Sequence, residues 1–230
     1  WIERLAVPKF RHCYTVCQPI ADELHHLYGV PCAVIRNLPL LADAPPPPVV
    51  NPFFIYQGAV NEGRSFETLI PAMKQVALPL HVFGDGNFLN QTRLLIKEHG
   101  LQQRVLLAGK KDPQELRQIT PTAFAGITLF ENNGRSNYFS LANRFFDYIA
   151  AGIPQICINF PSYRQINDVH NVALLVPDSQ PQTLAAAMNL LYTDSVLYAQ
   201  LKNNCKKAAE TLNWQQEERT LIAFYQSIIG

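Results

Sequence analysis

Beyond residue 50, short apolar runs alternate with helical stretches, and this alternation constrains the fold more than any other feature of the sequence. The six apolar runs cover residues 53–56, 80–83, 105–108, 125–130, 155–158 and 172–176. The expected helices cover residues 65–76, 87–98, 113–119, 141–150, 163–168, 181–192, 195–210 and 214–229. Continuous apolar strands separated by helices are typical of a parallel sheet that is covered on both faces. The pattern therefore predicts an α/β protein with a doubly wound, Rossmann-like parallel sheet.

The first 41 residues are too few for a domain of their own, and we interpret them as the end of a larger one. They contain a predicted strand, helix and second strand at 13–17, 19–28 and 32–35. Four consecutive prolines follow at 45–48, and such a run favours an extended chain. We therefore expect the end of an N-terminal domain at 1–41, a Pro-rich linker at 42–50, the main domain at 51–212 and a C-terminal crossing helix at 213–230.

The charge and hydropathy of the chain exclude two classes of partner. The net charge is +1, and no run of Lys and Arg is longer than a pair. Because nucleic-acid-binding proteins usually carry a basic stripe, we expect no nucleic acid as the main partner. No apolar run approaches the ~20 residues that a membrane-spanning helix needs, so we expect no segment to cross a membrane.

The five cysteines lie at positions 13, 17, 32, 157 and 205 and show no paired spacing. An odd number of scattered cysteines indicates reduced thiols in a cytosolic protein. Cys13 and Cys17 have no histidine at a metal-ligand spacing. We therefore expect the cysteines to be small buried residues rather than metal ligands.

Four loops are expected at the carboxyl ends of the first four strands, where ligands bind in sheets of this kind. They cover residues 58–64, 84–86, 109–112 and 131–138. Three of them open with Gly58, Gly84 and Gly109, and three carry a basic residue. One such glycine often marks a tight turn, but glycine also lets backbone approach a ligand, so the shared chemistry indicates a ligand site. The Gly84-x-Gly86 pair does not extend to a dinucleotide-binding pattern, because position 89 is leucine.

The segment 140–154 is predicted to form one helix with two faces, ended by a glycine and a proline. Two phenylalanines and Ile149 face a core, whereas Asn143, Arg144 and Asp147 share the other face. An amide, a guanidinium and a carboxylate near a helix start suit a phosphorylated ligand with hydroxyl groups. Arg144 would bind the phosphate and Asp147 the hydroxyls. The alternative is a solvated face with a surface Arg144–Asp147 pair, worth about 0.3 kcal/mol.

In order along the chain, several segments resemble the GT-B glycosyltransferases of the retaining, nucleotide-sugar-dependent kind (group 1, family 4-like). The matching segments are Cys13-Tyr-Thr-Val-Cys17, Val34-Ile-Arg-Asn37, Phe54-Ile-Tyr-Gln-Gly58 with Gly63-Arg64, Val82-Phe-Gly-Asp-Gly86, Val105-Leu-Leu-Ala-Gly109, Asp147-Tyr-Ile-Ala-Ala-Gly-Ile-Pro154 and the helix from Trp214. The family often has two glutamates separated by seven residues. In this sequence Asp147 stands at the second of these positions and Phe139 at the first.

This resemblance implies a hexosyltransferase-like enzyme that moves a sugar from a nucleotide sugar to an acceptor hydroxyl, in glycan or cell-surface polysaccharide synthesis. It implies that Arg64 and Arg144 are catalytic, because they stabilise the leaving diphosphate, and that Asp147 contacts the ribose. The remaining donor-binding residues would be Gly58, Gly63, Gly84, Gly109, Lys110 and Asn143. Because no Asp-x-Asp metal pair is evident, we expect neither a metal nor a cofactor to be required.

The acceptor site would lie in the N-terminal domain, of which this chain holds a remnant. We therefore expect the chain to bind donor nucleotide but to transfer little sugar by itself. The acceptor, a glycan, a lipid-linked molecule or a small molecule, is not identified by these residues. We expect a cytoplasmic location, and the inner face of the membrane, reached through the first domain, is the alternative. Two other functions stay open, a nucleotide-sugar epimerase of GT-B fold and a non-enzymatic interaction domain.

Overall fold

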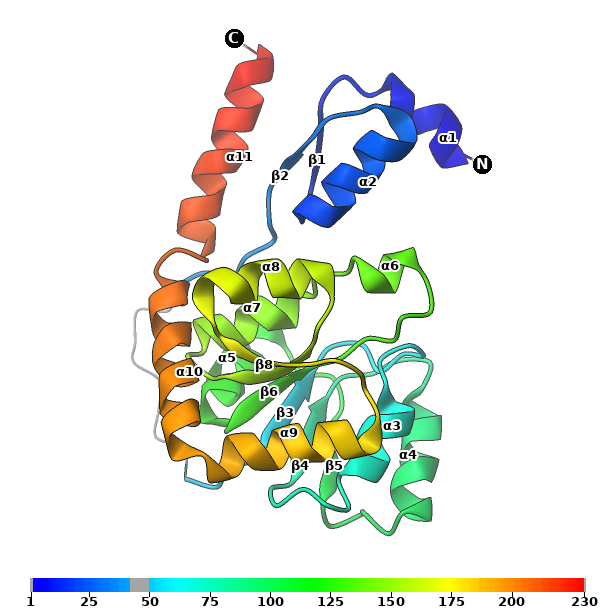
Figure 1. Ribbon diagram of the computed structural model, residues 1–230, viewed down its shortest axis with the longest axis vertical. Helices are drawn as coiled ribbons and strands as arrows, with labels where there is room; N and C mark the ends of the chain where they lie inside the picture. The colour runs from blue at the N-terminus through cyan, green and yellow to red at the C-terminus, as the bar shows by residue number, and fades with distance from the viewer. Residues whose placement is uncertain (1, 42–49, 230) are drawn as a thin grey trace.

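The computed structural model describes residues 2–41 and 50–229 of the chain. Residues 42–49 of the expected linker lie outside the described residues. The described residues form a large sheet with helices around it and a small N-terminal unit, beside which the C-terminal helix runs (Figure 1).

Six strands form the large sheet, and every neighbouring pair in it is parallel. They are β3 (Phe54–Gln57), β4 (Leu80–Phe83), β5 (Val105–Leu107), β6 (Ala125–Thr128), β7 (Gln155–Ile158) and β8 (Ala173–Val176). Their spatial order is β5-β4-β3-β6-β7-β8, so the direction in which the sheet grows reverses between β3 and β6. This is the doubly wound, Rossmann-like order, and it confirms the predicted fold class.

Helices cover both faces of this sheet, with α9 below it and α8 above it in the view of Figure 1. They are α3 (Phe66–Ala72), α4 (Leu89–Glu98), α5 (Pro113–Ile119), α6 (Arg135–Tyr138), α7 (Asn143–Ala150), α8 (Pro161–His170), α9 (Pro181–Thr193) and α10 (Ser195–Ala209), with a 3-10 turn η2 (Thr120–Thr122). Successive side chains of β3 point to opposite faces of the sheet. Phe54 and Tyr56 belong to the main core with Phe66 of α3, whereas Ile55 packs in a smaller cluster with Tyr148 of α7.

Helix α7 confirms the predicted helix over a shorter range than 140–154. Ala142 has an extended backbone and donates its N–H to the Tyr163 hydroxyl over 3.1 Å, so the helix begins only at Asn143. Its end is as predicted, because Gly152 adopts a φ of 67°. The N–H groups of Gly152 and Ile153 then reach back to the last helical carbonyls, which is the usual glycine-terminated helix end.

The N-terminal unit contains two parallel strands, β1 (Cys13–Thr15) and β2 (Cys32–Val34), joined by α2 (Gln18–Tyr28). A short helix α1 (Ile2–Ala6) and a 3-10 turn η1 (Val7–Lys9) precede them, and neither was expected from the sequence. The last helix, α11 (Trp214–Ile229), runs beside this unit (Figure 1). The rings of Tyr14 and Phe224 meet edge to face, with centroids 5.4 Å apart, so α11 contacts β1 directly.

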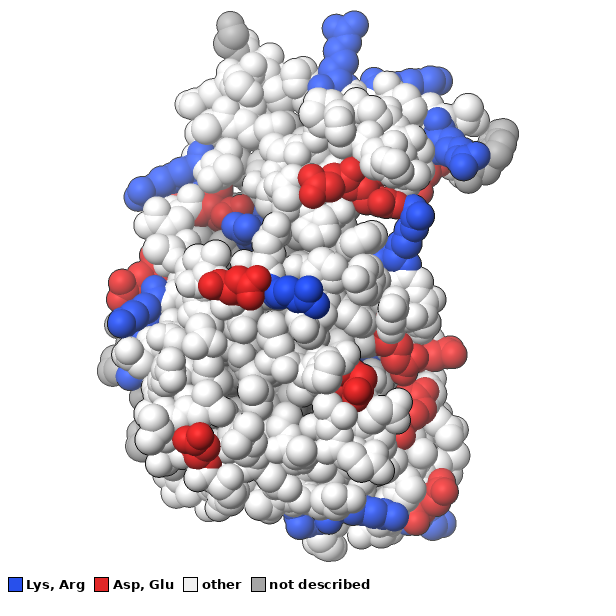
Figure 2. Space-filling view, in the orientation of Figure 1, with Lys and Arg blue, Asp and Glu red and all other residues white. Residues whose placement is uncertain are grey.

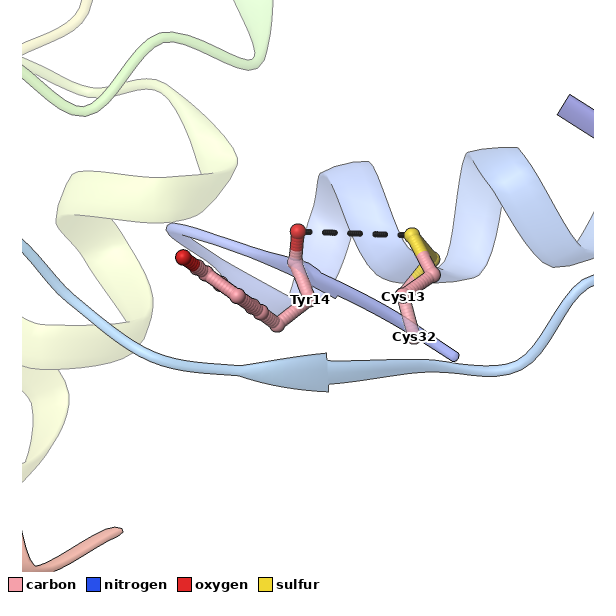
Figure 3. Close-up of a disulfide and its surroundings, with 3 residues drawn as sticks. All are labelled: Cys13, Tyr14 and Cys32. Carbon is pink, nitrogen blue, oxygen red and sulfur yellow. Dashed lines mark hydrogen bonds between the residues drawn. A yellow bond between two sulfur atoms is a disulfide. The ribbon is translucent and has the colours of Figure 1, made fainter. Parts of the chain in front are cut away.

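Cys13 and Cys32 form a disulfide bond between β1 and β2 (Figure 3). The two residues are partners in the parallel register, with Cα atoms 4.6 Å apart. The expectation of five reduced thiols is therefore wrong for these two, because strand pairing brings together cysteines that are 19 residues apart. Within the described ranges the other three, Cys17, Cys157 and Cys205, are free and buried, as predicted.

Candidate functional site

The loops that follow β3 and β6 flank the point where the strand order reverses, and this is where a ligand is expected in such a sheet. Backbone hydrogen bonds join these loops to their neighbours. The Glu131 N–H donates to the Gly63 carbonyl over 3.0 Å, which ties the loop after β6 to the loop after β3. The Val60 N–H donates to the Asp85 carbonyl over 2.9 Å, which ties the loop after β3 to the loop after β4.

The predicted glycines serve two different purposes. A Cβ at Gly84 would overlap the carbonyl oxygen of Gly58, so Gly84 lets one loop pack on the other rather than letting a ligand approach. Gly58 has a φ of 124°, and a Cβ there would lie 3.3 Å from Nη1 of Arg144. Gly109 has a φ of 73° with open space around its Cα, so a side chain there would be strained but would clash with nothing.

Arg64 lies half-buried at the end of the loop after β3. Its guanidinium carbon is 4.2 Å from the ring centroid of Phe130, and its Nη1 donates to Oδ1 of Asn137 over 2.9 Å. Burial, and then the charge of Arg144, lower the pKa of Arg64 from its ordinary value. A lowered pKa means that the protein environment opposes this positive charge, which a bound anion would relieve.

Arg144 is buried, with 7% of its surface exposed, although it was expected on a polar helix face. Its guanidinium carbon lies 4.6 Å from the ring centroid of Tyr56 and 4.9 Å from that of Phe130. Its Nη2 donates to the Leu129 carbonyl over 3.3 Å, while its Nε has no partner among the described residues. The alternative of a solvated surface pair with Asp147 is therefore wrong.

Asp147 is largely buried and accepts a hydrogen bond from Nε2 of Gln57 over 2.9 Å. Gln57 accepts in turn from the Thr120 hydroxyl over 2.7 Å. Burial raises the pKa of Asp147 to about 6, against the opposing effects of the Gln57 hydrogen bond and of Arg144 and Arg117. Gln57 was not predicted as a site residue. The sequence feature that could have indicated it is its position as a polar residue at the end of an otherwise apolar strand.

Two neighbouring cavities open at this edge of the sheet. The first, of about 330 Å³, is lined by Pro39, Leu40, Gln57, Pro113, Leu116, Arg117, Thr120, Pro121, Asp147, Ala150 and Ala151. The second, of about 500 Å³, is lined by Gly58, Ala59, Phe83, Gly84, Asp85, Gly86, Lys110, Lys111 and Leu116. Leu116 lines both, so the two cavities adjoin.

The structure thus brings most of the predicted site residues to one edge of the sheet. Gly58, Gly84 and Lys110 share the second cavity, and Asp147 lines the first. Arg64 and Arg144 line neither cavity but both lie against the ring of Phe130, which was not predicted as a site residue. The remaining predicted residues, Gly63, Gly109 and Asn143, also line neither cavity, and the Asn143 side chain is exposed at the start of α7.

No group of three or more His, Cys, Asp or Glu side chains among residues 2–41 and 50–229 is arranged to hold a metal ion. Likewise, none of the helices found in those ranges has the length and apolar character to cross a membrane. On the face that Figure 2 shows, acidic and basic side chains are interspersed.

The comparison with protein families gives one match. The family model described as "Glycosyl transferases group 1" matches residues 43–210, which is most of the chain. Among curated protein sequences, none matches this chain.

Solved structures show the same fold. TarM of S. aureus, solved as a G117R mutant with fondaparinux, α-GlcNAc-glycerol and UDP, is 13% identical with a TM-score of 0.78, over 97% of this chain and 46% of that one. HepE of Anabaena, solved with UDP and glucose, is 15% identical with a TM-score of 0.80, over 98% of this chain and 66% of that one. WaaG, a glycosyltransferase involved in lipopolysaccharide biosynthesis, is 13% identical with a TM-score of 0.71, over 90% and 60%. The chain therefore spans between about half and two thirds of the length of these structures.

Proposed function

This chain belongs to the family of glycosyl transferases group 1, and from that membership we propose that it carries the donor site of an enzyme that moves a sugar from a nucleotide sugar to an acceptor hydroxyl. The fold it shares with TarM, HepE and WaaG supports the proposal. The first two of those structures contain UDP.

The observation that carries the proposal is that two arginine side chains lie against the same aromatic ring, that of Phe130. Arg64 and Arg144 both lie within 5 Å of the Phe130 centroid, and within the described residues neither forms an ion pair with an acid. Two adjacent cations without an acidic partner repel one another, and an anion between them removes that cost. A nucleoside diphosphate is an anion of this kind, and it is also the leaving group of the proposed reaction.

In this mechanism the bond between the sugar and the β-phosphate breaks while the acceptor oxygen bonds to the same sugar carbon, with retention of its configuration. The proton of the acceptor hydroxyl passes to the departing β-phosphate oxygen. Negative charge develops on the β-phosphate in the transition state. Preorganised positive groups stabilise such charge, and they need not reorganise as it forms. Arg64 and Arg144 take that role, and the backbone at Gly58 and the Lys110 side chain complete the diphosphate site.

The nucleoside occupies the adjoining cavities, with its ribose at Asp147. A carboxylate accepts hydrogen bonds from two neighbouring hydroxyl groups, and Gln57 holds this carboxylate in place. The largely apolar walls of the first cavity, among them Leu116 and Pro113, suit the flat face of a base or the carbon face of a ribose. This assignment requires no metal and no cofactor.

The N-terminal unit and α11 belong to the acceptor side of the enzyme. The acceptor is a glycan, a lipid-linked molecule or a small molecule, and this chain alone transfers little sugar. The cytoplasmic location stays a prediction. Disulfide bonds such as Cys13–Cys32 are rare in reducing compartments. Cell fractionation with thiols blocked, which shows where the protein lies and whether this bond is formed there, is therefore the direct test of the cytoplasmic location.

The proposal is tested by calorimetric titration of the chain with UDP, GDP, ADP and dTDP and with their nucleosides. We expect one diphosphate to bind, and we expect Arg64→Ala to weaken that diphosphate much more than its nucleoside. Arg93→Ala, which removes an exposed arginine from α4, is the matched control and should leave binding unchanged. If no diphosphate binds, or if Arg64→Ala weakens nucleoside and diphosphate equally, the donor-site proposal is wrong.

A further inference from the structure

The loop after β6 places the side-chain amide of Asn137, which was not among the predicted site residues, beside Arg64. Oδ1 of Asn137 accepts from Nη1 of Arg64 over 2.9 Å, and Nδ2 of the same amide donates to Oδ1 of Asn133 over 2.7 Å. The two bonds fix the orientation of the amide, because its nitrogen needs an acceptor and its oxygen a donor. The arginine therefore faces an oxygen.

The backbone before Arg64 is shaped to this amide. Gly63 has a φ of 78°, and a Cβ there would lie 2.8 Å from Nδ2 of Asn137 and 3.0 Å from Nδ2 of Asn133. A side chain at this position would have to push the Asn137 amide aside and would crowd that of Asn133, whereas glycine lets the asparagine pair pack against the chain. The backbone hydrogen bond from the Glu131 N–H to the Gly63 carbonyl holds the two loops together at this contact.

The short helix α6, which carries Asn137, is held at both of its ends. Arg135 forms an ion pair with Glu23 of α2. Just after α6, the Phe139 carbonyl accepts from the Ser162 hydroxyl over 2.9 Å and from the Cys17 thiol over 3.5 Å. Asn137 therefore lies on a segment whose two ends contact residues other than Arg64 and Arg144.

We propose that Asn137 is a positioning residue that holds Arg64 over Phe130 and leaves its positive charge available for the donor diphosphate. The proposal rests on the donor site proposed above. An amide oxygen accepts the hydrogen bond without carrying a full charge, whereas a carboxylate at this place would pair with the guanidinium and compete with the phosphate. The side chain at this position must therefore be long enough to contact Arg64, and it must be uncharged.

The position of Arg64 can be measured without any nucleotide. Protons above the face of an aromatic ring resonate upfield, so NMR of the Arg64 side chain reports its place over Phe130. We expect the upfield shift in the wild-type chain and in Asn137→Asp, and its loss in Asn137→Ala. An unchanged Arg64 shift in Asn137→Ala overturns the positioning role.

Nucleotide titration then tests the consequence for binding. We expect Asn137→Ala to weaken the diphosphate that the wild-type chain binds, among UDP, GDP, ADP and dTDP, by about five- to tenfold, the range that one hydrogen bond accounts for. Asn137→Asp should weaken it at least as much, although Arg64 stays in place, and the nucleoside should bind equally to all three proteins. Full diphosphate affinity in Asn137→Asp overturns the requirement for a neutral acceptor.

A matched control exists on α4, where Oδ1 of the exposed Asn90 accepts from Nη1 of Arg93 over 2.7 Å. Asn90→Ala and Asn90→Asp should change neither the Arg64 resonances nor nucleotide binding. If the wild-type chain binds no diphosphate, the proposed function fails. The NMR measurement alone then decides whether Asn137 holds Arg64.

Discussion

Gln57 donates a hydrogen bond from its Nε2 to Oδ2 of Asp147 over 2.9 Å, and this bond joins the end of β3 to the middle of α7. It satisfies one oxygen of a carboxylate that burial otherwise disfavours, and the pKa of Asp147 still rises to about 6. The carboxyl therefore changes its charge within a pH range in which the folded protein can be studied.

Nucleotide binding should weaken on acidification because of this titration. A ribose hydroxyl donates best to the ionised carboxylate, which is lost as the pH falls through about 6. We expect up to about tenfold weaker binding at pH 5 than at pH 7.5, the factor that follows from one pH unit below the pKa. The terminal phosphate of the ligand also titrates near pH ~6, so Asp147→Asn, measured in parallel, isolates the contribution of the protein. Equal pH dependence in both proteins would exclude Asp147 from the binding site.

The raised pKa of Asp147 also leads to a prediction for stability. Ionisation of this carboxyl should destabilise the folded chain, whereas ionisation of a carboxyl with a lowered pKa stabilises it. The pKa of Asp147 is higher in the folded chain, at about 6, than its ordinary value of 3.8, so the folded state binds the proton more tightly. Ionisation of Asp147 therefore lowers the free energy of unfolding as the pH rises from about 4 to about 6. We expect Asp147→Asn to raise the urea-unfolding free energy at pH 7.5, by about 1–3 kcal/mol, while it weakens nucleotide binding.

The exposed Asp178 is the control for that measurement. Its carboxylate accepts from the Gln180 N–H over 2.9 Å, and this bond lowers the pKa of Asp178. Asp178→Asn should therefore not stabilise the chain at pH 7.5. If both variants change stability in the same direction, burial of Asp147 is not the cause of its effect.

Gly84→Ala should destabilise the sheet edge more than Gly109→Ala does. A Cβ at Gly84 would overlap the Gly58 carbonyl oxygen and lie 3.4 Å from Cγ2 of Val60, so the two loops would have to separate. At Gly109 the space is open and only the φ of 73° is unfavourable. We expect a loss of more than about 2 kcal/mol for Gly84→Ala, from overpacking, and of about 1 kcal/mol for Gly109→Ala, from backbone strain. Urea unfolding of the two variants measures the difference, and equal losses would show that loop packing does not require Gly84.

The sheet could be predicted from the sequence because its strands are buried on both faces. The apolar runs at 80–83 and 155–158 coincide with β4 and β7, and the others differ at their ends by a few residues at most. A buried parallel strand leaves a continuous apolar run, and the intervening helices impose the parallel direction. The carboxyl-edge loops, and with them the general place of the site, follow from that order.

Contacts between distant segments could not be predicted in the same way. The Cys13–Cys32 bond depends on the register of two strands that α2 separates. The burial of Arg144 depends on Tyr56 of β3 and on Phe130 in the loop after β6, which the fold brings beside it. Helix periodicity alone places an arginine on the polar face. Helix α6 lies in a polar segment with no apolar period, so both it and the role of Asn137 were missed.

Arg144→Lys should weaken diphosphate binding although it conserves the charge. The planar guanidinium lies against two rings, Tyr56 at 4.6 Å and Phe130 at 4.9 Å, and it also reaches the Leu129 carbonyl. A lysine ammonium is a compact point charge that does not reproduce the contacts of the broad guanidinium with both rings, and it desolvates at greater cost in a buried site. We expect a loss of about 1–2 kcal/mol both in unfolding free energy and in diphosphate binding, measured by urea unfolding and calorimetry. Arg93→Lys, on the exposed face of α4, should change neither quantity. Wild-type behaviour of Arg144→Lys would mean that the positive charge alone suffices and that the contacts of the guanidinium with the two rings are not needed.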